Sequence, residues 1–271
     1  MKKKYFFALA ALMWLAGATL AQDSNIVRGT ISQEQADKII KKVTENEGAF
    51  REALKNYVFN RDATIQTKGL GGQITGSYHR VSFMTFKEDG GRFERITLFP
   101  VPTLTEISVS PEDLEDLGGV NPFALEPGTS NLYNFVYVGK EKIDELDLHV
   151  FDVTPKVIPD WKKTSQRLFT GRIWVDDKDL MIVKSKGKAV PETKKQKFTV
   201  VETYRANVDG KFWFPSYSTS DDELVFDNGN VVKLRVRVKY TDYRQGRTDI
   251  TIIDDDDPAP KPAASPTPKK P

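Results

Sequence analysis

Residues 231–243 read VVKLRVRVKYTDY, and this stretch decides the fold. Apolar and basic side chains alternate in it at a period of two. The apolar set is Val232, Leu234, Val236, Val238 and Tyr240, and the basic set is Lys233, Arg235, Arg237 and Lys239. Because successive side chains of a β-strand point to opposite faces of the sheet, this pattern predicts a strand with one buried and one solvated face.

Similar runs recur through most of the chain. The expected strands are 57–67, 73–87, 92–99, 131–139, 145–154, 168–176, 180–188, 197–207, 211–220, 231–243 and 248–253. Short turn sequences such as Asp209-Gly210 and Asp227-Asn228-Gly229 separate many of them. Connections this short favour antiparallel neighbours, since a parallel crossover needs about a dozen residues or more.

One long helix is expected at 32–54, where apolar residues recur near the helical period of 3.6. Ser32 and Gln35 fit the capping box of a helix N-terminus. Gly48 weakens the middle of this helix by about 1 kcal/mol relative to alanine, so a bend or break there is plausible. The longest interruption between strands, 100–130, carries a short helix candidate at 111–117.

Several predicted strands are apolar on both faces. In 131–139, Tyr133, Phe135 and Tyr137 share one face, while Leu132, Val136 and Val138 share the other. A single helix covers only part of one face, and each exposed aromatic ring would present up to about 150–250 Å². The sheet is therefore expected to curl around a cavity of its own or to meet a ligand or partner.

A family resemblance appears in the hairpin FTGRIWVDDKDLMIVK at 169–184. With YRANVDGKFWFP at 204–215 and the strand end at 238–243, it resembles the Lol-type (LolA/LolB-like) proteins that sort outer-membrane lipoproteins. The resemblance spans most of the chain after residue 25. It implies a mainly β (α+β) fold: a curved antiparallel sheet forming an incomplete β-barrel, with an N-terminal helix and a loop or short helix covering its mouth. It also implies a hydrophobic cavity for acyl chains, and it assigns no individual binding residue.

The two ends differ from the rest of the chain. Lys2 to Lys4, the apolar run Tyr5–Leu20 and the small residues before Gln22 fit a secretory signal peptide at 1–21, cleaved near Ala21. We therefore expect a soluble periplasmic protein with one half-barrel domain at 25–253. The aspartates and prolines of 254–271 predict a disordered tail, which could alternatively attract calcium through its four aspartates.

Composition excludes several functions. With 40 basic and 38 acidic residues there is no global field to concentrate nucleic acid, and without cysteine the exported protein must be stabilised by its core. His79 and His149 are the only histidines and both fall in strand patterns, so neither a zinc nor another metal site is expected. No G-x-S-x-G motif is present, and paired carboxylates such as Asp221 and Asp222 fit solubility and turn roles. We expect no catalytic residue and no cofactor.

The function favoured by these patterns is non-catalytic binding or transport of a lipid, lipoprotein acyl chains or another apolar ligand. Partners would then be lipid or acylated protein and envelope transport components, and the carrier would be a monomer. The candidate cavity-lining residues are Tyr133, Phe135, Tyr137, Trp174 and Trp213. Two alternatives remain open: an envelope scaffold whose second apolar face docks a protein, and a hydrolase whose site forms only in three dimensions.

Overall fold

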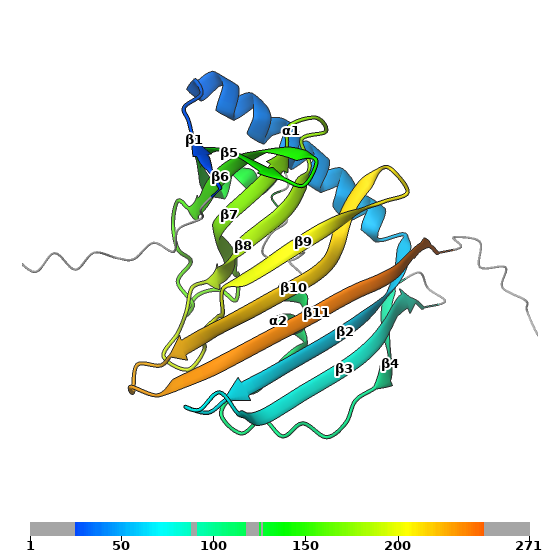
Figure 1. Cartoon of the computed structure of the whole chain (residues 1–271), viewed down its shortest axis with the longest axis vertical. Helices are drawn as coiled ribbons and strands as arrows, with labels where there is room; N and C mark the ends of the chain where they lie inside the picture. The colour runs from blue at the N-terminus through cyan, green and yellow to red at the C-terminus, as the bar shows by residue number, and fades with distance from the viewer. Residues whose placement is uncertain (1–24, 88–90, 118–124, 126, 247–271) are drawn as a thin grey trace, which may run out of the picture.

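A computed structural model describes residues 25–87, 91–117, 125 and 127–246. They form a single antiparallel sheet of eleven strands, with the order β1-β5-β6-β7-β8-β9-β10-β11-β2-β3-β4 (Figure 1). The strands are β1 (Val27–Arg28), β2 (Tyr57–Lys68), β3 (Ile74–Phe86), β4 (Arg92–Leu98), β5 (Tyr133–Ile143), β6 (Leu146–Pro155), β7 (Leu168–Asp176), β8 (Ile182–Val190), β9 (Val201–Val208), β10 (Phe212–Val225) and β11 (Val231–Gln245).

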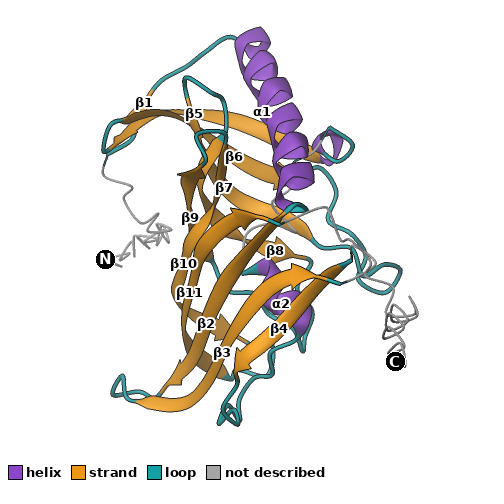
Figure 2. Ribbon diagram, turned by 90° about the vertical axis from the view of Figure 1, so that its right-hand side faces the viewer, coloured by secondary structure: helices purple, strands orange, loops and turns teal. Residues whose placement is uncertain are grey.

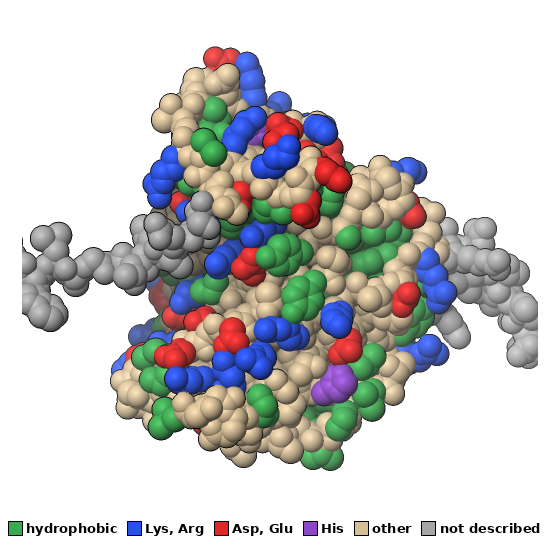
Figure 3. All heavy atoms as spheres, in the orientation of Figure 1, with side chains coloured by type: hydrophobic (Ala, Val, Ile, Leu, Met, Phe, Trp, Pro, Cys, Tyr) green, Lys and Arg blue, Asp and Glu red, His purple; other side chains and the backbone are tan. Residues whose placement is uncertain are grey.

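Buried and exposed side chains alternate along β11 as the sequence predicted. Val232 to Tyr240 at every second position are at most 7% exposed, whereas the intervening basic side chains reach solvent. Figure 3 shows many Lys and Arg side chains on the outer face of the sheet. In this fold β11 lies between its hairpin partner β10 and the distant β2, with Val236 opposite Ile65. The pairing of β11 with β2 joins the last described strand to the strand that follows α1 and makes one continuous sheet.

The sheet is strongly curved and does not close, because β1 and β4 lie at its two ends and do not pair with each other. Figure 2 shows the curve from the side, with the short helix α2 (Pro111–Asp116) inside it. The fold is therefore the open, mainly β half-barrel that was expected.

The long helix α1 (Gln33–Leu54) lies along the rim of the half-barrel (Figure 2). Ser32 and Gln35 form the expected capping box. The helix continues through Gly48, so no break occurs there. Ala36 and Val43 join the core against β5–β8, while Phe50 and Leu54 join the core against β9–β11 and β2. One helix thus packs on both halves of the sheet.

Some predicted boundaries were wrong. The segment 197–200 is not part of β9, and a 3₁₀ turn at Ser130–Leu132 replaces the start of the strand expected at 131–139. The two-residue strand β1, which pairs with β5, was not predicted because it is too short to show a period. The predicted signal peptide, the strand 248–253 and the tail 254–271 lie outside the described residues.

Part of the second apolar face of the sheet is also buried. On the face opposite to α1 there is a small core, against which Ile26 and Trp213 pack; its members are Leu148, Val150, Trp174 and Val183. Part of the two-sided apolar pattern is thus explained by the chain packing on itself. Within the described residues, neither helix is both long and apolar enough to span a bilayer.

Candidate functional site

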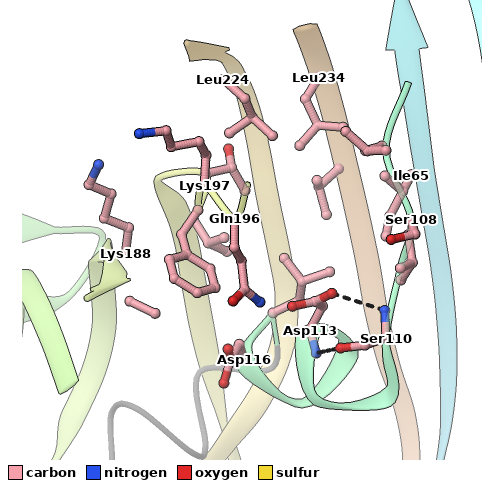
Figure 4. Close-up of a pocket in the computed structure, with 18 of the residues that line it drawn as sticks. Ile65, Ser108, Ser110, Asp113, Asp116, Lys188, Gln196, Lys197, Leu224 and Leu234 are labelled. Carbon is pink, nitrogen blue, oxygen red and sulfur yellow. Dashed lines mark hydrogen bonds between the residues drawn. The ribbon is translucent and has the colours of Figure 1, made fainter. Parts of the chain in front are cut away.

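A pocket of about 450 Å³ lies on the concave face of the sheet, beside α2 (Figure 4). Its apolar lining comes from five neighbouring strands, β8 to β11 and β2, and from the segments at 106–117 and 195–199. The apolar lining residues are Ile65, Ile107, Val109, Leu117, Ala189, Phe198, Val201, Leu224, Phe226, Leu234 and Val236.

The floor of the pocket follows directly from the strand pattern. Leu234 and Val236 belong to the buried set of β11, and Ile65 occupies the same face of β2. Figure 4 shows Leu224, Leu234 and Ile65 directed into the same space. Since these side chains stand side by side on adjacent strands, the floor is a continuous apolar surface.

The rim of the pocket is charged. The acids Glu106, Glu112, Asp113 and Asp116 lie on the segment that carries α2, and the bases Lys188, Lys195 and Lys197 lie on β8 and the following loop. Lys188 bonds Glu192 and Lys197 bonds Asp227, in each case at 2.8–2.9 Å between the ammonium nitrogen and the carboxylate oxygen. An apolar floor with a polar rim is the usual construction of a site for a small, mainly apolar ligand.

Helix α2 begins with a capping box formed by Ser110 and Asp113. The Ser110 hydroxyl accepts from the Asp113 amide at 3.1 Å, and the Asp113 carboxylate accepts from the Ser110 amide at 2.9 Å. Arg167 pairs with both Asp113 and Asp116, and its guanidinium lies 4.8 Å from the centre of the Phe198 ring. Leu114 of α2 and Leu117 directly after it are buried in the core that includes β9–β11 and β2. Arg167 therefore links α2 to the far wall of the pocket.

Burial raises the pKa of Asp116 to about 6, despite the opposing effect of the Arg167 guanidinium. Its unfolded-state pKa is about 3.9, so the folded state favours the protonated acid. The resulting stabilisation is complete below the unfolded pKa and is lost as the pH rises through 6. Asp116 accordingly contributes more to the stability of the fold in mild acid than at neutral pH.

We expect Asp116→Asn to flatten this pH dependence. The amide is neutral at every pH, so relative to wild type the variant should gain about 1–2 kcal/mol of unfolding free energy between pH 4.5 and 7.5. Urea unfolding of both proteins at the two pH values measures the difference. A relative loss of stability at pH 7.5 would show that the ion pair with Arg167 outweighs burial.

The five candidate aromatic residues lie elsewhere, and the structure does not bring them together into one site. Tyr133, Phe135 and Tyr137 pack in the core beneath the first half of α1, where the Tyr133 hydroxyl accepts from the Phe169 amide at 3.2 Å. Trp174 belongs to the core on the opposite face, and the partly buried Trp213 packs against both that core and the core that includes β9–β11 and β2.

The two tryptophans are held by acids. The Trp174 indole N–H donates to Glu141 at 2.6 Å and that of Trp213 donates to Asp179 at 2.9 Å. None of the five aromatic residues lines the pocket beside α2. Their role as ligand contacts stays a prediction.

The histidines are not gathered into a cluster. His79 bonds Asp62 at 2.9 Å, and His149 lies 5.9 Å from Tyr137 between ring centres. Burial lowers the pKa of His149, with a contribution from Lys140. In the described part of the chain, no three His, Cys, Asp or Glu side chains are close enough together to hold a metal ion.

Comparison with known proteins finds similarity only among solved structures: no protein-family model matches the chain, and no curated protein is significantly similar. A DUF1329 family protein from Desulfovibrio piger has 11% identity and a TM-score of 0.39, covering 80% of this chain and 95% of its own. A LolA superfamily protein from Nitrosomonas europaea has 13% identity and a TM-score of 0.33, covering 79% and 94%. MucB has 12% identity and a TM-score of 0.28, covering 77% and 93%.

Proposed function

We propose that this protein is an exported, non-catalytic carrier that shelters one apolar group, such as an acyl chain, in the pocket between α2 and the concave face. The observation that carries the proposal is the pocket itself, a space of about 450 Å³ above a continuous apolar floor. This volume falls in the range of roughly 300–1,000 Å³ found for small-molecule sites. Each methylene buried there contributes about 0.8 kcal/mol, so apolar contact alone can retain the ligand.

The two helices have different parts in this proposal. Helix α1 is fixed by a buried ion pair between Glu47 and Arg205 and by two core clusters. Helix α2 is short and its ion pairs with Arg167 are partly exposed. Ligand entry and release therefore proceed by movement of the α2 segment, while α1 stays on the sheet.

A matched pair of substitutions tests the pocket. Val201 lines it from β9, and its neighbour Val200 is 37% exposed and is not among the lining residues. We expect Val201→Trp to fill the space and to lower the affinity for a neutral apolar fluorescent probe at least tenfold. Val200→Trp should leave the affinity within twofold of wild type. Fluorescence titration of the purified proteins measures both.

Two results would contradict the proposal. One is a wild-type protein that fails to bind any neutral apolar probe and carries no lipid in native mass spectrometry after purification from its own envelope. The other is equal probe affinity in Val201→Trp and Val200→Trp, which would place the bound probe outside this pocket.

A second candidate function is docking of a protein partner at β4. This strand ends the sheet order, so its outer edge has no strand partner among the described residues. It exposes apolar side chains, with Phe93, Ile96 and Leu98 each 44–46% accessible. An open edge with apolar side chains is able to accept an added strand from another chain. Co-purification of a partner that is lost on placing lysine at Ile96 would favour this role.

A further inference from the structure

A compact polar cluster lies on the concave face of β2, β3 and β4, on residues that do not line the pocket. Glu94 accepts from three donors: the Arg61 and Arg80 guanidiniums and the Ser82 hydroxyl, each at 2.6 Å. Ser82 lies opposite Arg61 on the neighbouring strand. The three strands thus hold two arginines around one carboxylate.

The charges of this cluster do not cancel. Its side chains are only 7%, 16% and 21% exposed for Arg61, Arg80 and Glu94. Neither arginine forms an ion pair with a second acid in the part of the chain that the structure describes. One net positive charge is therefore largely shielded from water, and such a charge is costly unless an anion neutralises it.

Hydrogen-bond donors in the same place lack partners. The Arg80 Nε and the Tyr240 hydroxyl are buried without an acceptor. Tyr240 pairs in register with Arg61 on the adjacent strand, so both side chains stand on the same face. The Ser218 hydroxyl, which bonds Thr203 at 2.9 Å, also contributes a hydrogen bond that lowers the pKa of Tyr240, although burial has the larger effect. Because burial raises the pKa of Tyr240, its hydroxyl keeps its proton at neutral pH.

We propose that Arg61, Arg80 and Tyr240 form a binding site for an oxyanion, a carboxylate or a phosphate group. The planar guanidiniums present several N–H donors to such a group, and charge-assisted bonds of this kind are among the strongest in proteins. Glu94 and Ser82 position the two arginines. The bound anion brings the charge of the cluster to zero or below.

The oxyanion has two possible sources, a free anion or the headgroup of an amphiphile. Along β2, Arg61 is four residues from Ile65 in the pocket, which corresponds to about 13 Å of strand. An amphiphile whose chain lies in the pocket could therefore direct its headgroup toward the cluster. This second source rests on the proposed carrier function, whereas binding of a free anion does not.

The test uses inorganic phosphate, dodecyl phosphate and a neutral apolar probe on the purified protein. Phosphate should raise the melting temperature of wild type saturably, and Arg80→Gln and Arg61→Met should each weaken its binding at least tenfold. Glu94→Gln is the matched opposite, because its amide oxygen still accepts from the arginines while the negative charge that competes with phosphate is removed. This variant should bind phosphate more tightly than wild type. Binding of the neutral probe should be unchanged in all three variants.

The ligand-free proteins separate a binding role from a structural one. Arg61→Met leaves a neutral Arg80–Glu94 pair, so without phosphate it should melt no lower than wild type, whereas a purely structural Arg61 predicts a clear loss. Dodecyl phosphate binding at least tenfold more tightly than phosphate identifies an amphiphile headgroup, and equal affinities identify a free anion. If phosphate and dodecyl phosphate affect wild type no more than an Arg61→Met/Arg80→Gln double variant, the oxyanion site is overturned, whatever the neutral probe does.

Discussion

Replacing Glu47 by alanine is expected to cost about 3–5 kcal/mol of unfolding free energy, because it leaves the Arg205 guanidinium buried without its counter-charge. The Glu47 side chain is 0% exposed and that of Arg205 is 3% exposed, and two hydrogen bonds of 2.7 and 3.0 Å join them. The guanidinium also lies 4.6 Å from the centre of the Phe50 ring. Against a typical total stability of about 5–15 kcal/mol, such a loss would leave α1 poorly fixed. Urea unfolding followed by circular dichroism measures it.

Two further variants isolate the buried charge as the cause. Glu45→Ala, on the same helix, removes an exposed acid whose pair with Lys42 spans 3.7 Å, and it should change stability by less than about 1 kcal/mol. Glu47→Met combined with Arg205→Met removes both buried charges and should recover most of the loss. A cost below about 1 kcal/mol for Glu47→Ala would instead mean that Arg205 finds another acceptor, such as the Ile182 carbonyl at 3.4 Å.

The half-barrel was predictable because its pattern is local. The alternation of apolar and basic residues from Val232 to Tyr240 can be recognised from neighbouring residues alone. The apolar face that it defines lines the pocket at Leu234 and Val236. The strand order was not predictable in this way, since the pairing of β11 with β2 joins residues far apart in the chain. The position of a residue along its strand predicts which face of the sheet its side chain occupies, but it does not predict which strand lies beside it.

The charged residues inside the fold are harder to recognise from the sequence. Glu47 interrupts the apolar stripe of α1 between Val43 and Phe50, and Arg61 interrupts the buried face of β2 between Phe59 and Ala63. A charged residue in a buried register position indicates a paired or functional group. The partner of each residue depends on the tertiary fold and cannot be read from spacing.

The aromatic candidates show the limit of the same reasoning. Tyr133, Phe135 and Tyr137 do share one strand face, as their spacing predicts. That face is covered by α1, whereas the described pocket lies farther along the sheet beneath residues 106–117. Much of this segment is irregular, so no sequence period could have placed its residues over the floor.

Gly187→Ala is the second substitution with a large expected effect, about 3 kcal/mol of destabilisation from overpacking. Gly187 on β8 lies directly opposite Gly171 of the hairpin motif, and the Phe169 ring lies against both glycines. A Cβ at Gly187 would come within 2.1 Å of the Phe169 ring and 2.4 Å of the Thr170 carbonyl oxygen, so the strand pair or the ring must move. The direction of the change is informative, because replacing an uncrowded glycine within a strand by alanine would instead raise the unfolding free energy by about 0.5–1 kcal/mol.

Gly128→Ala is the control: its Cβ would meet nothing within 4 Å, and we expect a change in unfolding free energy within about 0.5 kcal/mol. Urea unfolding of the two variants measures both effects. Equal stabilities would show that β7 and β8 have room for a side chain, and the glycine of the motif would then need an explanation other than the close approach of Phe169.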